Sequence, residues 1–324
     1  MENKVDIVAL GELLIDFTEA ETSENRMKLF EQNPGGAPAN LLTVASHMGC
    51  KTAFVGKVGK DMHGKFLKET LEQENICTEY LVEDENVFTT LAFVAIDENG
   101  ERQFSFARKP GADTMLTMDD LDIDILRNCK IFHSGSLSLT DEPARGATVK
   151  AIQTAKEAGA LISYDPNYRD SLWKNEATAV EMMKSVIKYA DVMKVSDDES
   201  LLITGEDNYQ NAARMLVSSG VKLVAITLGG DGVLIATEKN MGIIPGLEVE
   251  AVDTTGAGDS FWGGFLSHYL GLGKEIEELS WEEVQECARY GNATAALCVQ
   301  KRGGIPAIPR KEEVEALVRK RSNP

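Results

Sequence analysis

The sequence predicts an α/β fold in which a mostly parallel sheet carries helices on both faces. The main observation is that helical and strand patterns alternate from residue 117 onward, and repeated units of this kind place their strands side by side in one sheet. A second is the length of 324 residues, which is enough to bury a large core. A third is a strand-like pair, residues 87–96 and 102–108 around the turn Asp97–Gly100, which stands apart from the alternation.

The N-terminal segments combine apolar strands with polar residues. Residues 5–10 are predicted as a buried strand, and residues 13–17 resume the apolar run. Asp16, within that second run, fits either a strand end or a ligand group, and spacing alone leaves both open. The polar segment 18–33 is expected to be exposed.

Periodicity and breaker residues give the remaining elements. Helices are predicted over residues 41–48, 65–75, 118–127, 144–158, 177–189, 211–219, 261–270 and 281–299. Further strands are predicted over residues 131–133, 161–164, 192–195 and 223–227. Because ligands of such sheets bind beyond the carboxyl ends of the strands, functional residues are expected directly after them.

The composition indicates which partners to expect. A net charge of −19 argues against binding nucleic acid or an anionic membrane through bulk electrostatics. The five cysteines are widely spaced without a zinc pattern, which indicates reduced thiols in a cytoplasmic protein. No apolar run reaches the roughly 20 residues that a membrane helix needs. We therefore expect small-molecule ligands, with no nucleic acid and no membrane.

The segment DTTGAGDSF, residues 253–261, carries the strongest chemical signal. Its residues Gly256, Ala257 and Gly258 can expose consecutive backbone N–H groups at the start of the helix that follows, and such a helix N-terminus attracts anions. A glycine turn or a first-turn carboxylate at Asp259 would each be unremarkable alone, but their combination favours an anion site. The dinucleotide fingerprint does not fit, because Phe261 stands where its third glycine should be, and no Walker A pattern occurs.

This segment resembles the C-terminal signature of the PfkB, or ribokinase-like, family of carbohydrate kinases. The segment PGGAPAN, residues 34–40, is similar to the N-terminal signature of that family. The resemblance runs from Gly11 to Ala307 and implies a ribokinase-like fold as one kinase domain over residues 1–324. It also implies a small β lid built from roughly residues 13–32 and 87–108. ATP and magnesium are the implied cofactors, with potassium as a further candidate.

The resemblance also assigns roles to individual residues, with Asp259 as the catalytic base. It places Gly256, Ala257, Gly258, Asp259 and Arg169 in catalysis. It assigns the sugar to Asp16, Gly35, Gly36, Asn40, Phe104, Arg108 and Asp259. It assigns the nucleotide to Thr227, Gly229, Gly230, Gly232 and Asn292. Magnesium is expected near Glu199, through water, and a monovalent cation near Asp253, Thr255 and Gly303.

Structural roles also fit several of these residues. Arg169 equally fits a helix cap or a partner of Asp170, and Glu199 fits an ordinary helix first turn. Asn292 is as compatible with a plain helix interior, and a lone arginine such as Arg108 at a strand end is usually solvated. Ser196 stands where the family has asparagine and offers one donor where an amide offers two, which weakens any role that the amide carries.

The function implied is transfer of the γ-phosphoryl group of ATP to a primary hydroxyl of fructose. Residues 34–40 and the segment RKPGAD, residues 108–113, resemble the fructokinases of the family most. The alternatives are 2-keto-3-deoxygluconate kinase, ribokinase or a nucleoside kinase and, in another class, a catalytically inactive sugar-binding regulator. Because exposed sheet edges seek partners, a homodimer through the lid is also expected.

Overall fold

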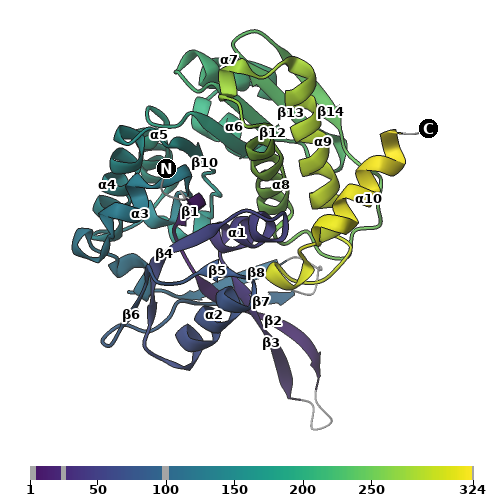
Figure 1. Ribbon diagram of the computed structural model, residues 1–324. Helices are drawn as coiled ribbons and strands as arrows, with labels where there is room; N and C mark the ends of the chain where they lie inside the picture. The colour runs from purple at the N-terminus through teal and green to yellow at the C-terminus, as the bar shows by residue number, and fades with distance from the viewer. Residues whose placement is uncertain (1–4, 23–26, 97–101, 323–324) are drawn as a thin grey trace.

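The computed structural model describes residues 5–22, 27–96 and 102–322 and is built around a ten-stranded sheet (Figure 1). The strand order is β14-β13-β12-β11-β10-β9-β1-β4-β5, and β6 pairs with β4. Its parallel strands are β1 (Val5–Leu10), β4 (Thr52–Gly59), β5 (Ile76–Cys77), β6 (Leu81–Asp84), β9 (Cys129–Ser134), β10 (Leu161–Tyr164), β11 (Val192–Ser196) and β12 (Leu223–Thr227). The antiparallel edge strands are β13 (Gly232–Thr237) and β14 (Met241–Pro245).

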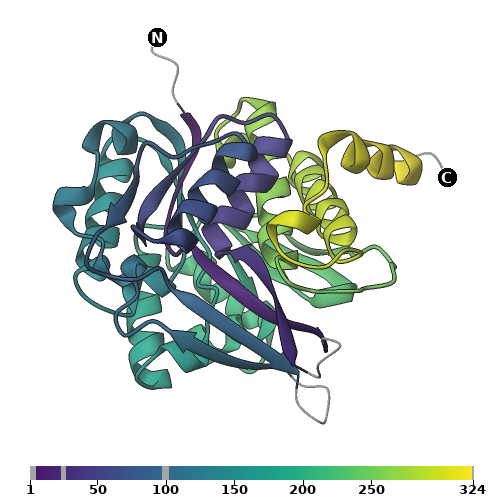
Figure 2. The ribbon, with the colours of Figure 1, turned by 90° about the horizontal axis from the view of Figure 1, so that it is seen from below.

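Helices cover both faces of this sheet, as the fold class predicts (Figure 2). One face carries α3 (Ile123–Arg127), α4 (Ala144–Glu157), α5 (Glu176–Ile187), α6 (Asp197–Thr204) and α7 (Tyr209–Ser218). The other carries α1 (Ala37–His47), α2 (Met62–Gln73), α8 (Ala257–Leu272) and α9 (Trp281–Cys298), and α10 (Lys311–Ser322) packs on α9. Side chains alternate between the two faces of the sheet along β1 and so contribute to two hydrophobic cores. Val8 and Leu10 pack with the helices of the first face, and Ile7 and Ala9 pack with those of the second.

A second sheet of four strands lies against one side of the molecule (Figures 1 and 2). Its order is β3 (Lys28–Gly35), β2 (Leu14–Thr22), β7 (Leu91–Ile96) and β8 (Arg102–Ala107). The expected pairing of residues 87–108 with residues 13–32 is confirmed, since β2 pairs with β3 and β7, and β7 with β8. Within the predicted exposed segment 18–33, residues 18–22 and 28–33 thus form strand, whereas residues 23–26 and the turn Asp97–Gly100 lie outside the described residues.

Several parts of the main domain differ from the prediction. The expected helix over residues 118–127 is a 3₁₀ turn (Met118–Asp120) followed by the short helix α3. Asp122 explains the break, because its carboxylate accepts from the backbone N–H groups of Asp124 and Ile125 and so caps a new helix. Strands β4, β5, β6, β13 and β14 are also absent from the prediction. No helix in the described ranges combines the length and apolar character that a bilayer span requires.

Close packing of α1 on α8 brings an N-terminal and a C-terminal helix of the chain together. Gly263 of α8 lies against α1 so tightly that a Cβ there would be 2.7 Å from Val44 Cβ and 2.9 Å from the Leu41 carbonyl oxygen. The side chains of Phe261, Trp262 and Phe265 fill the core around this contact. The N-termini of both helices therefore meet at the carboxyl end of the parallel strands.

We predict that Gly263→Ala is destabilising, because its methyl group would overlap a backbone carbonyl that cannot move freely. Overpacking of this kind costs about 1–3 kcal/mol in the free energy of unfolding. Gly271→Ala is the matched control, since it lies in the same helix with open space around it. That control should stabilise by about 0.4–1 kcal/mol. Urea denaturation measures both, and equal effects at the two sites would contradict this account of the helix contact.

Candidate active site

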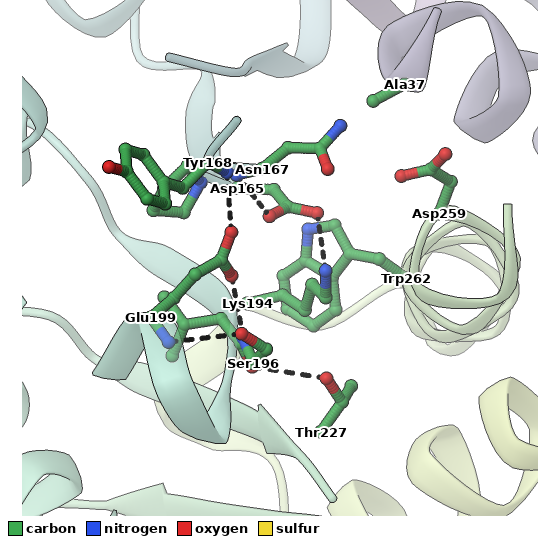
Figure 3. A network of polar contacts seen from close by, with 12 residues as sticks. Ala37, Asp165, Asn167, Tyr168, Lys194, Ser196, Glu199, Thr227, Asp259 and Trp262 are labelled. Atoms are coloured by element: carbon green, nitrogen blue, oxygen red, sulfur yellow. Dashed lines mark hydrogen bonds and ion pairs between the residues drawn. The ribbon is translucent and has the colours of Figure 1, made fainter. Parts of the chain in front are cut away.

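The predicted site residues gather where the parallel strands end. Ser134 pairs with Tyr164, and Ser196 with Thr227, so β9 and β10 end together, as do β11 and β12. Tyr164 pairs with Met193, so β11 continues to Ser196 beyond the end of β10. The N-terminus of α8 faces these ends (Figure 3). The polar side chains that follow the strands can therefore act on the same ligand as the segment 253–261.

Asp259 occupies the first turn of α8, directly beside Asn40 of α1. Gly256 precedes the helix in a left-handed conformation (φ 75°) that favours glycine. Asn40 Nδ2 donates a 2.8 Å hydrogen bond to Asp259 Oδ2, across 219 residues of chain. The amide oxygen Oδ1 of Asn40 is buried with no hydrogen-bond partner among the described residues. The two family signatures thus meet at one carboxylate.

The electrostatic surroundings of Asp259 suit proton transfer near neutral pH. Burial raises the pKa of Asp259 to about 6, and the nearby Asp165 carboxylate adds to this. The Lys194 ammonium, the Asn40 hydrogen bond and the Arg169 guanidinium oppose the rise. A carboxylate with a pKa near 6 is ionised at pH 7 yet remains basic enough to accept a proton.

Asp16 and the paired glycines form the adjoining wall. A Cβ on Gly35 would lie 2.3 Å from Asp16 Oδ2, so glycine is required for the carboxylate to sit there. Gly36 has a positive φ of 121° and packs on the Glu12 carbonyl. Burial raises the pKa of Asp16 to about 6, while Arg169 lowers it. Since Arg169 also acts on Asp259, the two carboxylates share one cation.

Glu12 is a buried acid at this wall that the sequence did not single out. Its Oε1 accepts from the backbone N–H of Ala37, the first residue of α1, at 3.0 Å. Burial is the main cause that raises the pKa of Glu12 to about 7. The only sequence signal is a glutamate set between two apolar runs. Its carboxylate fixes the start of the helix that carries Asn40.

Arg169 is exposed and follows β10 in the segment Asp165–Arg169. Its Nη1 donates to the carbonyl of Tyr168 at 2.9 Å, and Asp170 accepts instead from the Tyr168 hydroxyl. The expected alternative, an ion pair with Asp170, is therefore not found among the described contacts. The bond to Tyr168 uses one of the two terminal nitrogens of the guanidinium.

Glu199 is held rigidly by two backbone donors (Figure 3). Its Oε1 accepts from Tyr168 N at 2.6 Å and its Oε2 from Ser196 N at 2.8 Å. Ser196 Oγ accepts in turn from Glu199 N, which completes a capping box at the start of α6. The serine therefore has a structural task where the family has asparagine, and the Glu199 carboxylate ties the end of β10 to the end of β11.

Lys194 and Asp165 form a buried ion pair that sequence reasoning missed. The Lys194 ammonium lies 2.9 Å from Asp165 Oδ2, and both side chains are less than one-tenth exposed. In Figure 3 the pair lies between the end of β10 and the α8 helix. The available signal was a lysine inside the apolar strand β11.

Comparison with known proteins identifies this arrangement. Residues 4–311 match the pfkB family carbohydrate kinases. The chain belongs to this family. It is 42% identical over 321 residues to fructokinase-2 of Oryza sativa subsp. japonica, covering 98% of this chain and 95% of that protein.

Solved structures agree with this family assignment. The fructokinase with bound ATP from Xylella fastidiosa superposes with a TM-score of 0.90 at 30% identity, over 99% of this chain and 100% of that one. A double mutant of the fructokinase from Vibrio cholerae O395, in its fructose, ADP and potassium ion bound form, gives a TM-score of 0.87 at 29% identity, over 98% and 100%. These likenesses confirm the ribokinase-like fold.

Arg108, expected at the sugar from the family resemblance, is neither solvated nor free. Its Nε donates to Asp113 Oδ2 at 2.8 Å, Nη1 to Thr140 Oγ1 at 3.0 Å and Nη2 to the Leu137 carbonyl at 2.8 Å. It thus fastens the end of β8 to the loop after β9. Phe104 pairs with Val94 in the lid sheet, and its side chain lies outside the described residues.

The residues that the family signature links to nucleotide follow β12 and lie on α9. Thr227 ends β12, and Gly229 and Gly232 have positive φ values of 57° and 106° around Gly230. Asn292 is buried and its Nδ2 donates to the Ile244 and Pro245 carbonyls at 3.3 and 3.0 Å. This amide holds α9 to β14, so a contact with adenine stays a prediction.

The residues assigned to a monovalent cation lie on two loops that the Asp253 carboxylate joins. Asp253 Oδ1 accepts from Thr255 N at 2.9 Å, and its Oδ2 accepts from Gly303 N at 3.1 Å. The two loops that the family resemblance predicts around the cation are therefore side by side. No group of three acidic, histidine or cysteine ligands for a metal occurs within the described ranges.

Proposed function

We propose that this chain transfers the γ-phosphoryl group of ATP to a primary hydroxyl of fructose, forming fructose 6-phosphate and ADP. The observation that carries this proposal is the 2.8 Å hydrogen bond between Asn40 and Asp259, because it joins the sugar signature to the base. The choice of fructose is supported by 42% identity to a fructokinase and by the structural likeness to a fructose-bound one.

Asp259 acts as the general base. The Asn40 amide donates its hydrogen bond to Oδ2 of Asp259, which fixes the plane of the carboxylate. Oδ1 of Asp259 is left to accept the proton of the sugar hydroxyl. As that proton moves to Asp259, the sugar oxygen forms its bond to the γ-phosphorus while the bond to the β-phosphate oxygen breaks in line. The backbone N–H groups of Gly256, Ala257 and Gly258 stabilise the charge on the transferred group.

Asp16, Asn40 and the turn Gly35–Gly36 hold the sugar. The buried Asp16 carboxylate accepts hydroxyl hydrogen bonds, and Arg169 reaches toward both sugar and phosphate. We assign Phe104 and Arg108 to the edge of this pocket, Arg108 through its hold on the loop after β9. A site that bonds hydroxyls in this way rejects ligands that lack them, because its polar groups would stay unpaired.

ATP is assigned to the loop after β12, with Thr227, Gly229, Gly230 and Gly232, and to the side of α9 that carries Asn292. Both oxygens of Glu199 already accept backbone hydrogen bonds, which suits magnesium held through water better than direct ligation. Magnesium would neutralise phosphate charge. Potassium fits between the loops that Asp253 joins, with Thr255 and Gly303 on either side.

The four-stranded sheet serves as a lid in a single kinase domain. Strand β2 carries Asp16 into the site, so closure of this sheet over a bound sugar would exclude water from the phosphoryl transfer. A cytoplasmic location is consistent with five free cysteines, and cell fractionation would test it.

Asp259→Asn should lower kcat by about 10²–10⁴-fold, because the amide cannot accept the proton. Fructose and ATP affinities should change far less. The melting temperature at pH 7 should be unchanged or slightly raised. In the wild type, burial of the ionised Asp259 carboxylate destabilises the folded state above the folded pKa of about 6, and the amide of the variant removes this cost. The stability difference between variant and wild type should therefore disappear as the pH falls below about 4, near the unfolded pKa. In the wild type, kcat/KM should fall below pH 6 as Asp259 protonates.

Glu282→Gln provides the control for that variant. It removes an exposed first-turn carboxylate from α9 instead of α8. This change should cost at most about 0.3–1 kcal/mol of stability and leave kcat unchanged. If Asp259→Asn behaves like Glu282→Gln, with turnover within a few-fold of wild type, Asp259 is not the base.

In a panel of fructose, ribose, 2-keto-3-deoxygluconate, adenosine and inosine, fructose should give the highest kcat/KM. Asp16→Ala should raise the KM for fructose by about tenfold or more, since buried sugar hydroxyls would lose their acceptor. Glu19→Ala, in the same strand but paired at the surface with Lys28, should leave KM unchanged. A silent Asp16→Ala, or ribose as the best substrate, would contradict this pocket. ADP release that no sugar stimulates would favour a binding protein.

We further propose a homodimer through the lid sheet. Phe30 and Phe93 stand 41% and 38% exposed on it, with Phe93 stacked on Phe17. Light scattering should give twice the chain mass of 35.3 kDa. Phe93→Glu should shift it toward one chain, whereas Met215→Glu, on α7, should not. A single-chain mass for the wild type at micromolar concentration would refute the dimer.

A further inference from the structure

Lys194 is a buried cation that the proposed mechanism has not used. It lies inside β11 and is 5% exposed. Strand alternation puts Lys194 on the same face as Val192, which packs into the core with Phe261 and Trp262 of α8. Its side chain is therefore directed toward the helix that carries Asp259, as Figure 3 also shows.

The ammonium of Lys194 lies directly beneath the anion-binding turn. A Cβ on Gly258 would be 2.7 Å from Lys194 Nζ and 3.3 Å from Cε. Only a residue without a side chain can stand there while the lysine keeps its position. Glycine is otherwise a poor choice inside a helix. The close approach of the ammonium thus gives a physical reason for the second glycine of the turn.

The titratable and polar groups around Asp259 come from several elements. Asp165 and Arg169 follow β10, Lys194 comes from β11, the Cys298 thiol from α9 and the Asn40 amide from α1. Burial alone would lower the pKa of Lys194, but the carboxylates of Asp165, Glu199 and Asp259 raise it above its usual value. The ammonium therefore stays charged inside a site that must also accept phosphate.

We propose that Lys194 supplies the fixed positive charge of the anion-binding turn. Held by Asp165 behind Gly258, its ammonium acts through the turn to stabilise the charge on the transferred phosphoryl group. It also keeps Asp259 ionised. Lys194 is a positioning residue, because it acts through the Gly256–Gly258 backbone and Asp259. This inference rests on the proposed phosphoryl transfer.

The rival account makes the Lys194–Asp165 pair only a link between β10 and β11. A buried ion pair is weak evidence for stability, since apolar residues of similar size often serve as well or better. That account predicts that turnover returns when both charges are removed together.

The decisive variant is Lys194→Met, which keeps an unbranched side chain, one heavy atom shorter, and removes its charge. kcat should fall by about 10²-fold, the effect of losing one preorganised charge-stabilising group. The KM for fructose should stay within about threefold. Affinity for ATP should fall by about tenfold and affinity for ADP far less, because only ATP carries the γ-phosphate. The acidic limb of kcat/KM should move to higher pH.

Three further variants separate the effect of charge from the effect on folding. Lys194→Met/Asp165→Asn leaves no unpaired buried charge, so its melting temperature should return toward wild type while kcat and the preference for ATP over ADP stay reduced. Asp165→Asn alone keeps the ammonium and should retain that preference. Lys57→Met, which breaks a buried pair with Asp120, should lower the melting temperature without changing nucleotide binding.

Two results would overturn the proposed role of Lys194. A double variant whose turnover lies within about threefold of wild type would overturn the proposal. So would Asp165→Asn losing as much preference for ATP as Lys194→Met. Binding of ATP and ADP by calorimetry requires no sugar. If the wild type fails to phosphorylate fructose, the substrate assignment fails alone and the nucleotide measurements still test Lys194.

Discussion

The separation between α1 and α8 decides whether this molecule has a working site. Gly263 lets the two helices meet backbone to side chain, and that contact sets the 2.8 Å bond between Asn40 and Asp259. A wider spacing would leave the base without a fixed orientation and the amide without its partner. Glu12 controls the same spacing from the other end, because it holds the first residue of α1.

Glycine acts at the site mainly by letting charged groups come close. Gly35 admits the Asp16 carboxylate, and Gly258 admits the Lys194 ammonium. In both cases the side chain that uses the space comes from a different element of the fold. Burial disfavours the ionised carboxylates of Asp16 and Asp259, and the pKa of both is raised for this reason.

The sequence allowed the fold class and the contiguous motifs to be predicted. The turn of residues 256–259 could be recognised because its donors and carboxylate are neighbours in the chain, so local geometry suffices. The partners that matter most come from distant strands. Lys194 was missed for this reason, since one lysine in an apolar strand says nothing about the turn above it. The assignment of Arg108 was similarly limited, because Asp113, Thr140 and Leu137 compete for its donors only in the folded chain.

The length of chain between Asn40 and Asp259 has a consequence for how the protein is made. The two residues stand 219 positions apart, and every strand from β4 to β14 is synthesised between them. Contacts of such long range form late, because closing so large a loop has an entropic cost that other contacts must first offset. A nascent chain on the ribosome can therefore order its first strands long before it can transfer phosphate. A fragment that stops short of α8 would be catalytically silent however well it folds.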